Sequence, residues 1–149
     1  MRRRTKRVGL CGPLIALTTA AVFGCGPSPI TSAQIERAIE PTFANLVGVQ
    51  VSWLGLPPVA ASSFAVTASC RRLLDPSQGG AGDWECRLVW QGPDRRRLHD
   101  TYDLSVATDG CYVATITGDT LGGPTLKARD GHVVRNLLYA FEGCFDTTS

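Results

Sequence analysis

Hydrophobic positions between residues 31 and 47 recur every three or four residues, which predicts an amphipathic helix that packs on the core. Thr31 and Gln34 have the spacing of a capping box, which places the start of this helix at Thr31. Pro41 interrupts the pattern, so we expect a kink or two short helices. The segment from 48 to 58 then predicts a first strand, ended by a pair of prolines.

From residue 64 onward the hydrophobic period changes to two, which is the spacing of half-buried strands. A loop rich in Gly and Pro, from 73 to 83, separates the first two alternating runs. At the "TDG" turn, a three-residue loop with a bulge at Gly110 would place Val106 opposite Tyr112 and keep the apolar residues on one face. A two-residue loop would mix the faces, so we favour the longer one.

The C-terminal third predicts a short strand from 125 to 128 and a turn at Asp130 and Gly131. Hydrophobic residues between 133 and 141 then follow helical spacing, which indicates a last helix or an irregular packed segment. We therefore predict one α+β domain spanning residues 31 to 149. It has an N-terminal helix packed on an antiparallel meander of four to five strands, a packed C-terminal segment and two disulfides.

The N-terminus has the pattern of a secretory signal peptide. Five Lys and Arg residues stand in "MRRRTKR", and a mostly apolar run follows from Val8 to Phe23. This run of about 16 residues is shorter than the roughly 20 that a membrane-spanning helix needs. An uncleaved signal anchor is the alternative. We expect residues 1–24 to be removed.

Cys25 is the predicted lipidation site. Val22, Phe23 and Gly24 precede it in the order of a bacterial lipobox, although Phe23 stands where a small residue is usual. Residues 25–30 contain glycine and two prolines, as suits a short extended tether. Two acyl chains on Cys25 suffice for stable anchoring. The membrane is therefore the predicted partner, and the predicted location is its extracytoplasmic face.

Removal of the signal peptide changes the charge balance. The full chain carries 15 Lys and Arg against 13 Asp and Glu, but five of the basic residues lie before residue 8. The remainder has a net charge of −3, with no basic domain of the kind that binds nucleic acid. We therefore predict no nucleic-acid partner.

Four cysteines remain beyond the signal peptide and Cys25, namely Cys70, Cys86, Cys111 and Cys144. An even number in an exported domain predicts two disulfides, for which three connectivities exist. We favour Cys70–Cys86, across one hairpin, and Cys111–Cys144, because Cys111 points away from the apolar face. Zinc ligands would come in close pairs, and none occurs, so no metal site is predicted.

Candidate catalytic residues are few. His99 stands beside Asp100 in "LHDTYD", and a hydrolase site assembled around His99 is the alternative function. The sequence contains neither a G-x-S-x-G elbow nor a phosphate-binding lysine motif, so we predict no cofactor. The arginines at 95–97 would contact anionic headgroups or form a solvated turn, and the three tryptophans would line a groove or pack in the core.

Several segments resemble a group of small actinobacterial lipoproteins of uncharacterised function. These are an N-terminal helix after a lipobox cysteine, "DWEC", "YDLSVATDGCYVA" and "NLLYAFEGCFDTT". The resemblance implies fold and location only. The function we expect is a non-enzymatic binding or accessory module of the cell envelope, with an envelope protein or a small ligand as its partner.

Overall fold

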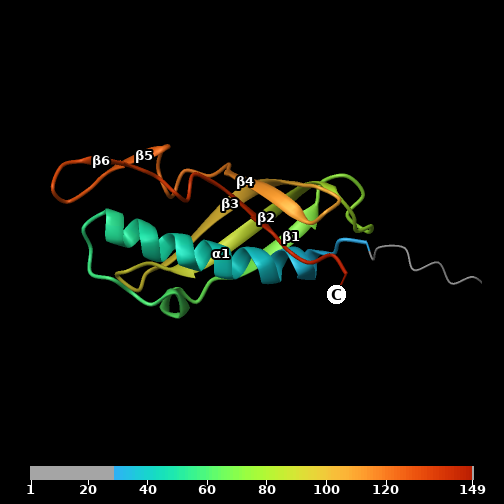
Figure 1. Cartoon of the computed structure of the whole chain (residues 1–149), viewed down its shortest axis with the longest axis horizontal. Coiled ribbons are helices and arrows are strands. Elements are labelled where there is room, and N and C mark those ends of the chain that lie inside the picture. The colour runs from blue at the N-terminus through green and yellow to red at the C-terminus, as the bar shows by residue number, and fades with distance from the viewer. Residues whose placement is uncertain (1–28, 149) are drawn as a thin grey trace, which may run out of the picture.

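The capping box at Thr31 begins a single long helix, α1 (Ser32–Trp53), in the computed structural model, which describes residues 29–148 (Figure 1). The Gln34 amide donates to the Thr31 hydroxyl, and the Thr31 amide donates to the Gln34 side-chain oxygen at 2.9 Å. The predicted start of the helix is therefore confirmed, together with its cap.

The predicted end of the helix and the predicted first strand are wrong. α1 continues without interruption through Pro41, which lies on its exposed side, where water can satisfy the carbonyl that lost its donor. The segment from 48 to 58 looked like a strand because its valines alternate, yet Val49 is exposed and Gln50 is buried. The Gln50 side-chain oxygen accepts a hydrogen bond from the Leu137 amide at 2.6 Å, whereas its buried side-chain nitrogen has no partner among the described residues.

Seven strands and one short 3₁₀ helix follow α1. They are η1 (Ala61–Phe64), β1 (Thr67–Arg72), β2 (Gly82–Gln91), β3 (Arg97–Val106), β4 (Cys111–Ile116), β5 (Thr125–Lys127), β6 (Val133–Arg135) and β7 (Ala140–Cys144). Five strands form one antiparallel sheet in the order β1-β2-β3-β4-β7, and β5 and β6 form a separate pair. The α+β fold class is confirmed, with a helix packed on an antiparallel sheet of five strands.

The turn between β3 and β4 has the predicted register. Val106 pairs with Tyr112 and Leu104 with Ala114. Gly110 has φ of 84°, a left-handed conformation that glycine adopts without steric cost. All four paired residues are buried, so the longer loop keeps the apolar side chains on one face.

Of the two alternatives for the C-terminal segment, the helix is wrong, and the segment packs on the core without helical structure. Residues 133–144 form β6, a turn and β7 instead, and Val133 at the start of this segment is exposed. Buried Asn136 fixes the turn, because its side-chain nitrogen donates to the carbonyls of Leu121 and Gly123, both at 2.9 Å. Its side-chain oxygen accepts from the Leu138 amide. One polar side chain therefore replaces the backbone hydrogen bonds of a helix.

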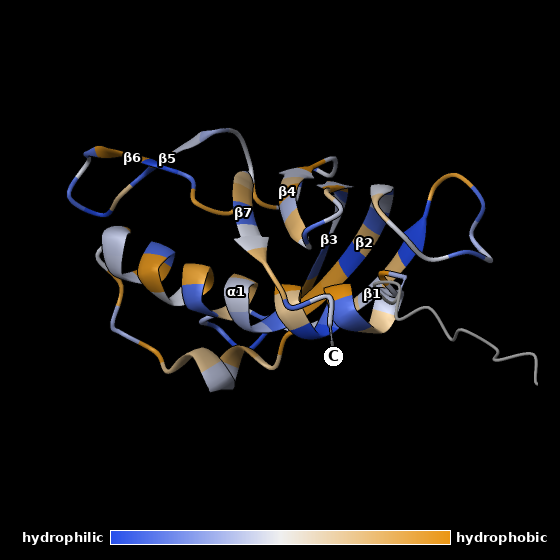
Figure 2. Ribbon diagram, turned by 45° about the vertical axis from the view of Figure 1, so that its right-hand side comes forward, coloured by the Kyte–Doolittle hydropathy of each residue, from blue (hydrophilic) through white to orange (hydrophobic). Residues whose placement is uncertain are grey.

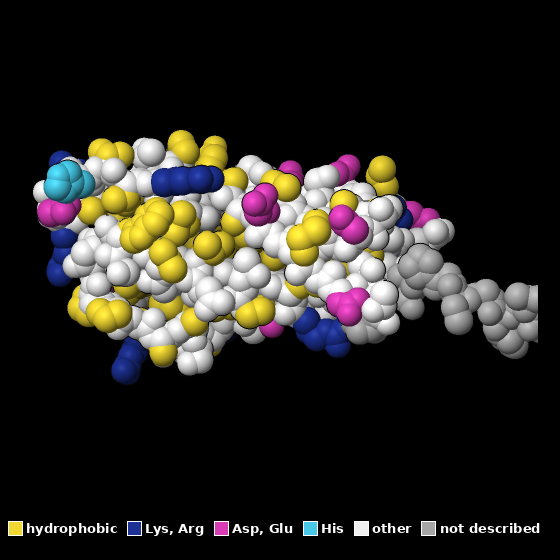
Figure 3. All heavy atoms as spheres, in the orientation of Figure 1, with side chains coloured by type: hydrophobic (Ala, Val, Ile, Leu, Met, Phe, Trp, Pro, Cys, Tyr) yellow, Lys and Arg dark blue, Asp and Glu magenta, His cyan; other side chains and the backbone are white. Residues whose placement is uncertain are grey.

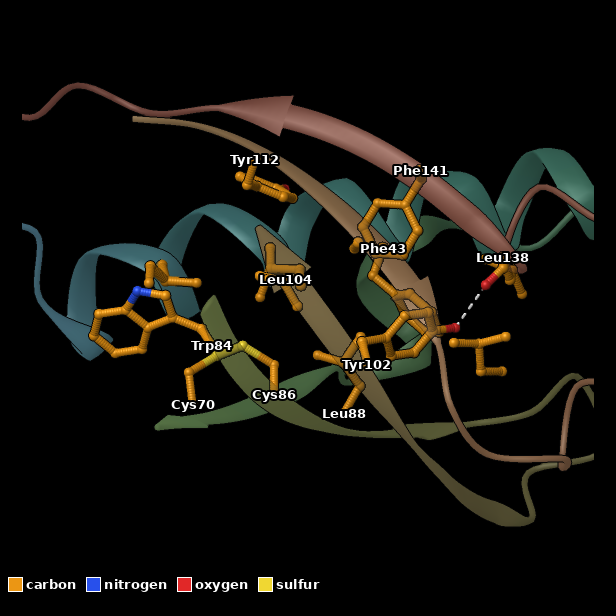
Figure 4. Packing of buried hydrophobic residues seen from close by; sticks show 14 of the residues in the cluster. Phe43, Cys70, Trp84, Cys86, Leu88, Tyr102, Leu104, Tyr112, Leu138 and Phe141 are labelled. Carbon is orange, nitrogen blue, oxygen red and sulfur yellow. Dashed lines mark hydrogen bonds between the residues drawn. A yellow bond between two sulfur atoms is a disulfide. The ribbon is translucent and has the colours of Figure 1, made fainter. Parts of the chain in front are cut away.

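The core lies between α1 and the sheet. The ring of Phe43 meets that of Trp90 edge to face, with 5.0 Å between centroids. The rings of Phe141 and Tyr102 meet in the same way at 5.4 Å (Figure 4). The buried Tyr102 hydroxyl donates to the carbonyl of Leu138 at 2.8 Å. This contact ties the central sheet to the C-terminal turn.

The two faces of the sheet differ in what covers them. Figures 1 and 2 agree in placing α1 along one face of the strands. α1 is the only α-helix in residues 29–148, and no helix lies on the opposite face, which we call the open face. Side chains alternate between the two faces along each strand, so the open face carries the exposed residues of β2, β3 and β4.

Candidate functional site

The four cysteines form the two favoured disulfides, Cys70–Cys86 and Cys111–Cys144. The first joins β1 to β2 on the helix side and is buried (Figure 4). The second joins β4 to β7 on the open face, as the outward direction of Cys111 predicted. Each disulfide therefore secures one edge strand to the interior of the sheet.

Cys25, the signal peptide and most of the tether lie outside the described residues. Ile30 is the first described residue that packs on the domain. It is only 4% exposed, and its carbonyl accepts a hydrogen bond from the Gly80 amide at 2.7 Å. Within residues 29–148, no helix is both long and apolar enough to cross a membrane.

His99 and Asp100 are not brought together. They are consecutive residues of β3, so their side chains project to opposite faces, and His99 is exposed whereas Asp100 is buried. Among residues 29–148, no group of three metal-binding side chains occurs. The geometry gives the hydrolase interpretation no support.

The arginine run forms the turn between β2 and β3. Arg96 pairs with Asp94 at 2.9 Å, and both side chains are largely exposed. Trp84 and Trp90 are core residues, whereas Trp53 at the end of α1 is 47% exposed. Figure 3 shows hydrophobic side chains gathered over the C-terminal half of α1, the half that ends at Trp53. The three tryptophans therefore do not line a common groove.

The most prominent hollow lies on the open face, where β3, β4 and β7 run side by side. It has a volume of about 670 Å³, and its lining includes Ser105, Val113, Glu142 and the Cys111–Cys144 disulfide. We call it the open-face hollow. A second hollow of about 370 Å³ adjoins it and shares Ser105 and Val113. Val113 is 51% exposed on this face and, with the disulfide, supplies part of the apolar lining of the open-face hollow.

Negative charge predominates at one end of the open face, where the one basic side chain that β1 directs to this face, Arg71, pairs with Glu85 at 2.7 Å. Exposed Asp103 and Glu142 line the hollows at the end near the β3–β4 turn, and Asp83 joins them there. Exposed Arg87 and Arg97 stand toward the opposite end of the same face, near the β2–β3 turn. A ligand of the hollows would therefore meet carboxylates beside an apolar floor, which favours basic groups.

A smaller hollow lies on the helix side of the same edge of the sheet. It has a volume of about 320 Å³ and is lined by Gln34, Arg37 and Ala38 of α1 together with Phe145 and Asp146, and we call it the helix-side hollow. Hydrogen bonds from the Thr148 hydroxyl and amide lower the pKa of the Asp146 carboxyl, which keeps it ionised. This hollow therefore combines an apolar ring with charges of both signs.

Comparison of the chain with protein-family models, with curated proteins and with solved structures gave no match.

The sequence patterns did not predict any of these three hollows. Each combines residues from segments far apart in the chain, and no local pattern marks them. Val113 was the one residue whose sequence position pointed to the open-face hollow. Its neighbours Tyr112 and Ala114 face the core, so the alternation places this large apolar residue on the opposite face.

Proposed function

We propose that the protein is a lipid-anchored, non-enzymatic binding module of the extracytoplasmic cell envelope, and that its ligand is a segment of another envelope protein. The open-face hollow carries this proposal. With a volume of about 670 Å³ and an apolar floor, it lies on the face that no helix in residues 29–148 covers. Apolar pockets with a few polar groups are the usual form of binding sites.

The anchor at Cys25 would hold this domain close to the bilayer. Four residues lie between Cys25 and buried Ile30, and the five steps of an extended chain span at most about 3.3–3.6 Å each, or roughly 18 Å here. A module held at such a distance meets membrane proteins and other anchored proteins at high effective concentration. Modest affinity at the hollow would then suffice.

A photoreactive amino acid at Val113 tests the proposal in intact cells. We expect a discrete crosslinked adduct that identifies the protein seated over the open-face hollow. Ser69 is the matched control, because it is exposed on the same face but lies on β1, three strands away from Val113. Equal adducts at both positions, or none at Val113, would contradict the proposal.

The anchor has its own test. The mature protein extracted from membranes should carry a diacylglyceryl adduct on Cys25, seen in its intact mass, and the Cys25→Ala variant should lack it. An unmodified Cys25 in the wild-type protein would refute the anchor.

A further inference from the structure

The two edges of the five-stranded sheet are treated differently. At the β1 edge, the carboxylate of Glu40 accepts from the Ala68 amide and that of Glu36 from the Cys70 amide, both at 2.8 Å. These amides point away from β2, where a further strand would otherwise bind. The helix therefore blocks the β1 edge, which is one way that proteins prevent unwanted strand pairing.

At the β7 edge, no side chain in the described part of the chain takes up the outward amides in this way. The Ile116 amide donates to the Tyr139 carbonyl, and the Phe145 amide donates to the Gly110 carbonyl. These two bonds show which residue pairs between β4 and β7 are the hydrogen-bonded ones. Because bonded and non-bonded pairs alternate, the backbone groups of Ala140, Glu142 and Cys144 point away from β4. Figure 2 shows β7 at the margin of the sheet, and among residues 29–148 no strand lies beyond it.

The hollows lie on either side of this edge. The open-face hollow includes Glu142 and Cys144 in its lining, and the helix-side hollow includes Phe145. A strand added to β7 would direct successive side chains alternately to the two faces, and so alternately toward the two hollows. Main-chain hydrogen bonds with pockets for alternate side chains are the elements of peptide recognition by strand addition.

We infer that β7 is the attachment edge for an extended segment of the partner protein, with a basic side chain opposite Glu142; this inference rests on the proposed function and specifies its binding mode. Glu142 is exposed, and Asp103 and Asp83 extend the negative charge across the hollows. Opposite charges that face each other across paired strands stabilise the pair. The carboxylates therefore select a basic residue at that position of the segment.

A second copy of this chain fits the edge less well. The register that uses all three outward-pointing residues in both copies would pair Glu142 with Glu142, and like charges directly opposite one another are destabilising. Any shifted register leaves at least one outward residue unpaired. The charge at the centre of the strand therefore favours a foreign basic segment.

Substitution of Glu142 by proline tests the inference in the full chain. Proline removes an amide that points away from the sheet, so the β4–β7 ladder keeps its hydrogen bonds while an added strand loses a donor. With the photoreactive residue at Val113, we expect the adduct to fall about tenfold or more in Glu142→Pro. The matched variant Glu142→Gln keeps the amide and loses only the charge, so we expect a fall of about two- to fivefold.

Peptide competition in isolated membranes keeps the protein itself unaltered. The probe is an alternating valine–lysine hexapeptide, whose lysines would face Glu142 and whose valines would face the helix-side hollow. It should suppress the Val113 adduct, whereas a twin that is N-methylated at the lysines, or carries glutamate in their place, should not. Equal suppression by the probe and its N-methylated twin would overturn strand addition.

The outcomes separate the two proposals. A Val113 adduct that persists unchanged in Glu142→Pro overturns strand addition and leaves the binding module standing. The absence of an adduct in the wild-type chain overturns both.

Discussion

Replacement of Glu36 and Glu40 by alanine tests whether α1 holds the β1 edge. Each carboxylate accepts one 2.8 Å hydrogen bond from a β1 amide, of Cys70 and Ala68 respectively. Alanine removes both acceptors and leaves the two amides to water. The helix should remain, since alanine is the best helix former.

The expected loss of stability is about 2 kcal/mol for the double variant. A hydrogen bond to a charged group stabilises by about 1.5–3 kcal/mol, and we take the lower limit because both glutamates are half-buried, which gives about 3 kcal/mol for the pair. Relief of the like-charge repulsion between residues four apart returns roughly 0.2–0.5 kcal/mol. The higher helix propensity of alanine returns a few tenths of a kcal/mol at each position.

Urea denaturation of the wild type and the double variant measures this difference, and about 2 kcal/mol corresponds to a fall of roughly 8 °C in melting temperature for a domain of this size. Glutamine at both positions keeps a neutral acceptor, so we expect about half of the loss. Asn45→Ala, on the exposed side of the same helix, should change stability by no more than about 0.5 kcal/mol.

A loss in the double variant no larger than that of Asn45→Ala would refute the reasoning. Hydrogen exchange gives an independent check, because the Ala68 and Cys70 amides should exchange faster once their acceptors are gone. Unchanged exchange at both amides would show that the glutamates do not protect the edge.

Three further predictions concern the rest of the fold. Serine at both Cys111 and Cys144 should lower the free energy of unfolding by about 4 kcal/mol in the loop-entropy view, since the bond closes a separation of 33 residues, and denaturation without reductant measures it. Tyr102→Phe leaves the Leu138 carbonyl without its donor and should cost about 1–3 kcal/mol at neutral pH. Burial raises the pKa of the Tyr102 hydroxyl, so above about pH 10 the folded chain keeps the hydroxyl proton while the unfolded chain loses it. The free energy of unfolding should therefore fall above about pH 10, and this fall should be smaller in Tyr102→Phe. Gly110→Ala forces alanine to a φ of 84° and brings its Cβ against the Phe145 carbonyl, so it should cost more than about 1–2 kcal/mol, a result that an unchanged denaturation midpoint would contradict.

Local patterns predicted the parts of this fold that local physics determines. The capping box gave the start of α1, and the alternation on both sides of Gly110 gave the register of β3 and β4. That register placed Cys111 on the open face, which is why the pairing with Cys144 was accessible from the sequence.

The errors arose where a distant contact decides the structure. Gln50 is buried because Leu137, which is 87 residues away in sequence, supplies a donor, and this contact lets the helix extend through a segment of alternating valines. Asn136 likewise holds a turn through carbonyls of Leu121 and Gly123. The hollows were inaccessible for the same reason, since strand order rather than sequence brings β7 beside β4.

Amide hydrogen exchange at the two sheet edges tests the central claim most directly. In the isolated full-length protein, the outward amides of Glu142 and Cys144 should exchange much faster than those of Ala68 and Cys70, whose acceptors are glutamates. In membranes that contain the crosslinked partner, the β7 amides should become protected while the β1 amides stay as they were. If exchange at Glu142 and Cys144 is the same with and without the partner, β7 is not the binding edge.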